Sequence, residues 1–290
     1  MGALDGKVAI VSGAGQGLGR AHALTLAAEG ASVVVNDVAG AQPVVDEITA
    51  AGGRAVASSA SVSDWKATKE LVDQAVDTYG DLHALVNNAG ILRDKMSFSM
   101  DEAEWDAVID VHLKGHFCLS HHAAVLWREQ AKGGASTPRR IINTTSEAGL
   151  FGSAGQANYA SAKGGIITLT WVLARELGKY GVTVNVIAPR ARTQMTDNMS
   201  FFAPPADGGF DRYDPFHVSK AVAWLATDST GDINGQVFIV IGGDVHLVRP
   251  FDIANTIHRD GGWTVEELIA ARAELFGDRP TGPPMTGVAS

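Results

Sequence analysis

Short apolar runs alternate with longer helical patterns along most of the chain. Each run is rich in Val, Ile or Ala and ends beside a Gly or a polar residue, which is typical of a strand buried on both faces. Between the runs, apolar residues recur every three or four positions, as they do on the covered face of a helix. The pattern predicts strands at 7–12, 32–36, 54–57, 84–86, 140–143, 183–187 and 236–240.

The helical patterns complete this arrangement. One begins near Leu18, and the others are predicted at 44–51, 65–79, 104–129 and 158–179. Strands that alternate with helices form a parallel sheet covered on both faces. The predicted fold class is therefore α/β, a doubly wound parallel sheet of the Rossmann kind, in a single domain.

Two later segments depart from this rhythm. Residues 197–216 hold three prolines, two glycines and five aromatic residues, a composition that predicts a mobile lid over a bulky substrate, with an ordinary surface loop as the alternative. In the tail that begins at Arg249, a short helix is predicted at 265–275, with Thr264 as its N-cap and Glu267 at the capping-box position.

Composition narrows the class of function. The formal net charge of −9 disfavours a surface that binds nucleic acid, because such surfaces use Lys and Arg to neutralise phosphates. Cys118 is the single cysteine and cannot form an intramolecular disulfide. The start has no leader-like apolar segment, and no run of about 18 apolar residues follows. A soluble cytoplasmic protein without a membrane partner is expected.

A glycine-rich turn follows the first predicted strand and opens the first helix. Glycines 13, 17 and 19 allow the backbone to turn tightly and to approach a pyrophosphate, whose charge is stabilised at a helix N-terminus. A tight strand-to-helix connection is the alternative interpretation. The position between a strand and a helix favours a dinucleotide site.

The choice of dinucleotide depends on two residues. Asp37 ends the second strand, where a carboxylate accepts hydrogen bonds from the adenosine ribose and repels a 2′-phosphate. Arg20 is the competing signal, because a guanidinium after the glycine turn can reach that phosphate. The carboxylate stands where the extra phosphate must lie, so NAD(H) is the predicted cofactor rather than NADP(H).

The candidate chemistry lies around Tyr159. Lys163 is four residues further along a predicted helix, so the two side chains share one face, and an ammonium beside a phenol stabilises the phenolate. Ser146 follows a strand end, where its hydroxyl can bond a carbonyl oxygen that gains charge. The sequence Asn87-Asn-Ala-Gly90 follows another strand end and would line the same crevice.

Taken together and in this order, these motifs resemble the short-chain dehydrogenase/reductase family. The resemblance covers about 5–246, leaves about 247–290 as a C-terminal extension, and implies that Ser146, Tyr159 and Lys163 are catalytic. It implies a homodimer or homotetramer. The implied cofactor-binding residues are Gly13, Gln16, Gly17, Leu18, Gly19, Asp37, Ser61, Val62, Asn88, Ala89, Gly90, Tyr159, Lys163 and Pro189.

Four segments carry a closer likeness. They are 32–37, 87–94, 111–115 and 155–159, and they resemble the (3R)-hydroxyacyl-CoA dehydrogenase part of the multifunctional enzymes type 2 and its bacterial single-domain relatives. The implied substrates are small alcohols and ketones, above all 3-hydroxyacyl-CoA esters, with a steroid as one acyl group.

Three positions depart from the family pattern. His112 stands where many members have Asn, although the subgroup just described also has His, and it is included as a candidate catalytic residue. Ser61-Val62 stands where an Asp-Val pair often holds the adenine, with Asp64 as an alternative. Arg190 follows Pro189 in place of the common Gly, which weakens the transfer of roles to the loop that follows.

Other functions remain open at this stage. His112, His116, His121 and His122 invite a zinc site, but no carboxylate or cysteine pattern completes four ligands, so no metal is expected. Among enzymes, a 3-oxoacyl-acyl-carrier-protein reductase is the nearest alternative and would favour NADPH. From another class, the chain could be a non-catalytic nucleotide-binding regulator, against which the intact Ser146, Tyr159 and Lys163 argue.

Overall fold

The computed structural model describes residues 2–193, 203–205, 208–249 and 251–282. They fall into two compact units, Met1–Val248 and Arg249–Ser290. Within the described residues, no helix is both long enough and apolar enough to cross a membrane.

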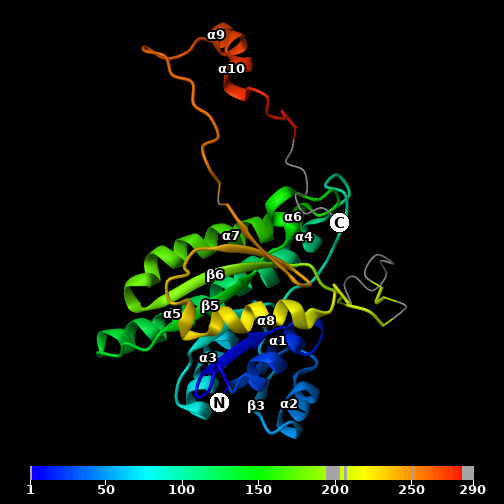
Figure 1. The fold of residues 1–290 in the computed structure, drawn as a ribbon, viewed down its shortest axis with the longest axis vertical. Coiled ribbons are helices and arrows are strands. Elements are labelled where there is room, and N and C mark those ends of the chain that lie inside the picture. The colour runs from blue at the N-terminus through cyan, green and yellow to red at the C-terminus, as the bar shows by residue number, and fades with distance from the viewer. Residues whose placement is uncertain (1, 194–202, 206–207, 250, 283–290) are drawn as a thin grey trace. The chain divides into compact units, whose positions relative to one another are not determined.

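A single twisted sheet forms the centre of the first unit (Figure 1). Its strands lie in the order β3-β2-β1-β4-β5-β6-β7-β8, and all neighbours are parallel except β7 and β8. This order confirms the predicted doubly wound fold. The strands are β1 (Val8–Ser12), β2 (Ser32–Asn36), β3 (Arg54–Ser58), β4 (Ala84–Asn87), β5 (Arg139–Thr144), β6 (Val182–Pro189), β7 (Val237–Ile241) and β8 (Asp244–Val248).

Helices cover both faces of the sheet. Helices α1, α2 and α8 cover one face, and α3, α5 and α7 cover the other (Figure 1). Val11 and Val33 pack in the first layer, and Ile10 and Val34 pack in the second. The α-helices that the structure describes in this unit are α1 (Gly17–Ala28), α2 (Ala41–Ala50), α3 (Trp65–Tyr79), α4 (Glu102–Ile109), α5 (Gly115–Lys132), α6 (Glu147–Phe151), α7 (Ala157–Leu177) and α8 (Pro215–Ala226).

The structure corrects the sequence prediction in four places. Strand β8 pairs antiparallel with β7, so the sheet is not wholly parallel, and its exposed side chains make no apolar run that would reveal it. The helix predicted at 104–129 is interrupted by a π-helical turn, Asp110–Lys114, between α4 and α5. Helix α6 has no buried residue and was not predicted, and α8 begins inside the predicted lid.

The second unit contains the two short helices α9 (Val265–Ala270) and α10 (Arg272–Phe276). The predicted capping box is present, because the Thr264 hydroxyl accepts from the Glu267 amide and the Glu267 carboxylate accepts from the Thr264 amide. The helix predicted at 265–275 is divided at Ala271, which is the C-cap of the first helix and the N-cap of the second.

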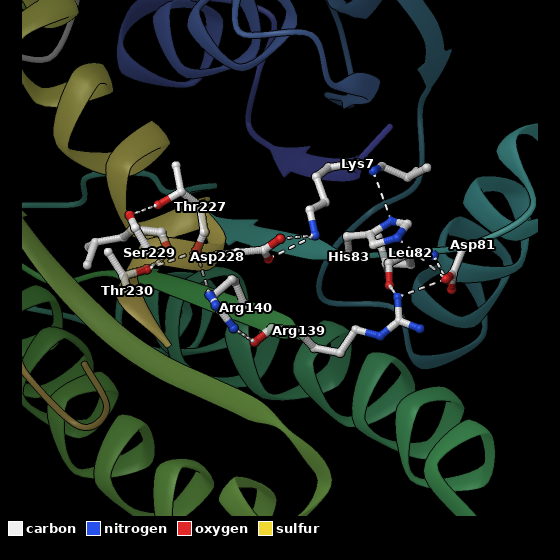
Figure 2. A network of polar contacts seen from close by, with 12 residues as sticks. Lys7, Asp81, Leu82, His83, Arg139, Arg140, Thr227, Asp228, Ser229 and Thr230 are labelled. Carbon is white, nitrogen blue, oxygen red and sulfur yellow. Dashed lines mark hydrogen bonds and ion pairs between the residues drawn. The ribbon is translucent and has the colours of Figure 1, made fainter. Parts of the chain in front are cut away.

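Charged side chains gather at the amino edge of the sheet, where the strands begin (Figure 2). The Lys7 ammonium pairs with Asp228 at 2.8 Å, and the Arg139 guanidinium pairs with Asp81 at 3.0 Å. The Arg140 side chain donates from Nε to the Thr227 carbonyl at 3.1 Å. This network joins the starts of β1 and β5 to the segment after α8 and leaves the opposite edge to the polar residues described below.

Acid should destabilise the fold through His22. Its ring is fully buried beside the Ser219 hydroxyl, with Nδ1 at 2.8 Å, and burial lowers its pKa from 6.5 to about 3. Between these values the unfolded chain binds a proton that the folded chain does not, so stability falls as pH falls, by about 1.4 kcal/mol per pH unit from this group.

Urea unfolding at several pH values between about 5.5 and 4 tests this expectation. In the His22→Asn variant, the slope of the unfolding free energy against pH should be smaller by about 1.4 kcal/mol per pH unit. The matched control is His258→Asn, because solvent reaches that exposed ring in both states. An unchanged slope in His22→Asn would show that the histidine does not carry the effect.

Candidate active site

A pocket lies at the carboxyl edge of the sheet, where the ends of β1, β2, β4, β5 and β6 meet. This edge is where open α/β sheets bind ligands. The pocket is lined by Gly13, Gln16, Gly17, Leu18, Gly19, Asp37, Asn88, Gly90, His112, Thr144, Thr145, Ser146, Tyr159, Lys163, Pro189 and Thr193. Most of the predicted site residues are therefore brought together.

The glycine turn forms one wall of the pocket. A Cβ on Gly19 would lie 2.0 Å from the Gly13 carbonyl oxygen, so helix and turn approach as closely as backbone allows. Gly13 has a φ of 63°, in the left-handed region that favours glycine. The N-cap residue Gln16 makes no capping bond with its side chain, so the first amides of α1 lack that partner, and residues 16–19 line the pocket.

The two residues that bear on cofactor choice lie in different environments. The Asp37 carboxylate accepts from the amides of Gly15 at 3.0 Å and Ala39 at 3.1 Å, which holds it at the end of β2. Arg20 forms an ion pair with Glu47 of α2, in which Nη2 donates to both carboxylate oxygens, at 2.6 and 2.7 Å. The guanidinium is thereby drawn toward α2, and it is not among the residues that line the pocket.

The two adjacent asparagines at the end of β4 have different roles. The Asn88 amide group donates to the carbonyls of Ser12 and Gly13, both at 3.1 Å, and so ties the end of β4 to the glycine turn. Asn87 is buried and donates to Ser120 and Asn143, both at 2.9 Å. Asn88 therefore shapes the pocket, whereas Asn87 belongs to a polar network inside the fold.

The catalytic candidates meet at the start of α7. Tyr159 hydrogen-bonds with Ser146, and the Lys163 Nζ lies 5.5 Å from the centre of the tyrosine ring. Lys163 is almost completely buried and donates to the Thr144 carbonyl at 2.7 Å. The side chains of all three line the same pocket, as the motif spacing predicted.

Burial governs the protonation of this group. It raises the pKa of the Tyr159 phenol, while the hydrogen bond with Ser146 opposes that rise. Burial also lowers the pKa of Lys163 from 10.5 to about 7. At neutral pH the phenol therefore holds its proton, and the lysine is close to the point at which it can lose one.

His112 lies in the π-helical turn between α4 and α5, an arrangement often found at functional sites. Its ring stands edge-on to that of Tyr159 with centres 5.2 Å apart, and Nε2 lies 2.8 Å from the Ile91 carbonyl. Burial, reinforced by the charge of Lys163, lowers the pKa of His112 to about 3. The imidazole is therefore neutral, and Nδ1 has no hydrogen-bond partner within the described residues.

Three predicted cofactor residues do not line this pocket. Ser61 bonds Ser63 at 3.0 Å beside a separate hollow, and buried Val62 packs against Gly115. Ala89 packs its backbone against the glycine turn, and its amide donates to the Ser12 hydroxyl at 3.2 Å. The alternative Asp64 instead caps α3, because its carboxylate accepts from the Ala67 amide at 2.7 Å.

Other pocket residues escaped the prediction. Thr144 and Thr145 line the pocket directly before Ser146, and their place at the end of a strand was a usable signal. Thr193 also lines it, from the loop after β6. Buried Asn158 donates to the carbonyls of Arg93 and Glu104, at 3.0 and 3.1 Å, and fixes the start of α7. Nothing local in the sequence marks that role.

The predicted lid lies partly outside the described residues, including Phe201 and Phe202. In its described part, Asp211 pairs with Arg192, and the Tyr213 carbonyl accepts from the Arg192 amide at 2.7 Å. The Phe210 ring is 66% exposed and contacts His217, with centres 4.8 Å apart. The described end of this segment is thus anchored to the loop after β6.

The histidines considered for zinc have other partners, and the rings of His121 and His122 contact each other and Trp65. His116 Nε2 accepts from the Thr144 amide at 3.4 Å, and His122 Nε2 lies 2.9 Å from the Trp65 carbonyl. Within the part of the chain that the structure describes, no three His, Cys, Asp or Glu side chains gather as metal ligands would.

Comparison with known proteins gives consistent matches. Residues 7–201 match the short chain dehydrogenase family. The hydroxyacyl-CoA dehydrogenase ChsB1 of Mycobacterium tuberculosis is 50% identical over 287 residues, which make up 95% of this chain and 90% of that protein. The crystal structure of a short chain dehydrogenase from Mycobacterium avium is 49% identical with a TM-score of 0.90, over 99% of this chain and 100% of that one.

A longer protein also matches. The peroxisomal multifunctional enzyme type 2 of Drosophila melanogaster is 40% identical over 259 residues, which are 84% of this chain but 41% of that protein. These matches confirm the resemblance predicted from the motifs.

Proposed function

Because this chain belongs to the short-chain dehydrogenase family, we propose that it is an NAD(H)-dependent oxidoreductase that interconverts the alcohol and ketone of 3-hydroxyacyl-CoA esters. Esters with a steroid acyl group and free hydroxysteroids fall within the same proposal. The observation that carries it is the meeting of Ser146, Tyr159 and Lys163 with the glycine turn in one pocket.

The pocket residues fit a dinucleotide. The close approach of Gly13 and Gly19 leaves room for a pyrophosphate at the start of α1, where the free amides carry partial positive charge. Asp37 lines this pocket and an adjoining hollow formed by 37–43 and 57–59, so its carboxylate is placed to accept from ribose hydroxyls. When bound, NAD(H) supplies or accepts the hydride.

The residues of the chain handle the proton and the substrate oxygen. In ketone reduction, the Ser146 hydroxyl orients the carbonyl, and Tyr159 donates its phenolic proton to the oxygen as negative charge develops there. One hydride and one proton convert the ketone to the alcohol. In alcohol oxidation the tyrosine accepts the proton, and Lys163 beside the ring stabilises the phenolate in its protonated form.

Two observations support the substrate class, namely the similarity to a named relative and the exposed apolar side chains near the start of α7. A relative that is 50% identical over nearly its whole length is named a hydroxyacyl-CoA dehydrogenase. Beside the start of α7, Asp94 accepts from Gln156 at 2.8 Å, and the same loop exposes the apolar side chains Met96 and Phe98. Apolar surface next to the catalytic tyrosine suits a long acyl chain.

Assays of the purified protein test the proposal. Oxidation of 3-hydroxyacyl-CoA esters of increasing length, and of steroid alcohols, is followed through NADH formation. A 3-oxoacyl-acyl-carrier-protein reductase would prefer NADPH and carrier-protein thioesters. A nucleotide-binding regulator would bind NADH without turnover of any member of the panel.

We expect a preference for NAD over NADP of at least about tenfold, or about 1.4 kcal/mol. The Asp37 carboxylate repels a 2′-phosphate, and the competing guanidinium of Arg20 is paired with Glu47. Asp37→Ser should narrow the ratio of kcat/KM for the two cofactors. The control Asp46→Ser changes an exposed carboxylate of α2 and should preserve the ratio. A wild-type preference for NADP would contradict the proposal.

A further inference from the structure

An ion pair joins the residue after the catalytic serine to the residue after the proline of the pocket wall. The Arg190 guanidinium donates from Nε to one oxygen of Glu147 at 2.7 Å and from Nη2 to the other at 2.6 Å. The two side chains are only 16% and 17% exposed. Partly shielded, bidentate pairs of this kind combine strength with a defined geometry.

The pair lies where the main-chain contacts between β5 and β6 end. The last of these is the bond from the Thr145 amide to the Ile187 carbonyl, at 2.7 Å. Beyond it, the end of β6 keeps only its pairing with β7, which continues past the strand because the Arg190 amide donates to the Val240 carbonyl at 2.9 Å. The side chains of Glu147 and Arg190 then connect the two diverging segments, one carrying Ser146 and the other Pro189.

Helix α6 needs such a connection. It spans five residues, none of them fully buried, and Leu150 packs partly buried against the apolar core. On one side it is held by α7, because a Cβ on Gly149 would lie 2.6 Å from the Lys163 carbonyl carbon. The Glu147–Arg190 pair supplies a second attachment, to the segment directly after β6. Ser146 is the N-cap residue of α6, directly before Glu147.

We propose that Glu147 and Arg190 are positioning residues that set the place of the Ser146 hydroxyl relative to the Pro189 wall. This inference rests on the proposed hydride-transfer function. The serine hydroxyl orients the substrate oxygen, while the wall borders the pocket that takes the nicotinamide. The ion pair therefore fixes the reacting carbon with respect to the hydride. Arg190 stands where the common family pattern has a glycine, which has no side chain to form such a pair.

The effect should be kinetic rather than a loss of binding. A misplacement of about 1 Å at a reacting centre costs about 10²-fold, so Glu147→Gln should lower kcat about 10- to 100-fold. The affinity for NADH should change less than about threefold, because neither paired residue lines the pocket. Hydride transfer should become rate-limiting, which raises the primary isotope effect with deuterated NADH.

Two further variants separate positioning from general stability. The charge-reversed double variant Glu147→Arg with Arg190→Glu should recover kcat relative to either single change, because the pair can form again. The matched control is Asp81→Asn, which removes the carboxylate of the Arg139 pair at the opposite edge of the sheet (Figure 2). It should lower thermal stability and leave kcat and the isotope effect unchanged.

Hydrogen exchange supplies a measurement that needs no substrate. Amides of residues 147–152 should exchange faster in Glu147→Gln than in the wild type and Asp81→Asn. The inference would be overturned if Glu147→Gln had the wild-type kcat and the wild-type rate of amide exchange. It would also be overturned if this variant lost only thermal stability. If the wild-type protein turns over no alcohol or ketone, the proposed function fails, whereas exchange in α6 still shows whether the ion pair holds that helix.

Discussion

Tyr159→Phe is expected to lower kcat by about 10²- to 10⁴-fold, the range in which a positioned acid or base contributes. The substitution removes the phenolic oxygen and keeps the ring, which packs edge-on against His112. The proton that reaches the carbonyl oxygen then has no donor in the place where Ser146 orients the substrate. NADH affinity should stay within about threefold of the wild-type value, because the ring still fills its place in the pocket.

Steady-state kinetics in both directions and NADH titration by fluorescence measure these quantities. Tyr79→Phe is the matched control, because it removes a phenol from α3, which lies away from the pocket. It should retain wild-type kcat. Wild-type rates in Tyr159→Phe would remove the tyrosine from the mechanism, and equal losses in both variants would point to a general effect on the fold.

Ser146→Ala is expected to lower kcat by about 10²- to 10³-fold, as the loss of one donor to a developing oxyanion does. A second effect follows from the hydrogen bond with Tyr159, which lowers the pKa of the phenol. Without that bond the pKa rises further above its ordinary value. Because alcohol oxidation needs the phenolate, its rate profile should move to higher pH in the variant.

The pH dependence of kcat for oxidation, measured in the wild type and the variant, checks both effects. Ser146 also caps α6 by accepting from the Ala148 amide at 3.2 Å, so Ser146→Thr provides a variant that keeps the hydroxyl and the cap. The control is Ser153→Ala, because Ser153 lies in the exposed segment after α6, and this variant should keep the wild-type rate and profile. An unchanged rate and profile in Ser146→Ala would exclude the serine from the chemistry.

The motifs carried most of the site because their geometry is local. A Tyr and a Lys four residues apart share a helix face wherever that helix lies, and a glycine turn between strand and helix makes the same cradle in any doubly wound sheet. For this reason Gly13, Tyr159 and Lys163 could be placed from sequence. Ser61 and Val62 were assigned by resemblance to a position where this chain has different side chains, and they lie outside the pocket.

Contacts between distant segments escaped the sequence. The state of Arg20 depends on Glu47, which lies 27 residues away, and Glu147 meets Arg190 across 43 residues. The sequence around Arg20 or Arg190 does not indicate whether the guanidinium contacts solvent, a ligand or a carboxylate of the same chain. The neutral state of His112 likewise follows from burial and from the nearby Lys163 charge, neither of which local spacing reveals.

By itself, the sequence determined the doubly wound fold and the family, because apolar runs and helical periodicity specify which faces are buried, and because short motifs specify local geometry. Only the tertiary structure decided the antiparallel strand β8, the π-helical turn at His112 and the pairing of Glu147 with Arg190. The physical reason is the same for all three. Each depends on which segments come into contact when the chain folds. The interaction energy of these contacts cannot be inferred from the residues that are neighbours in the sequence.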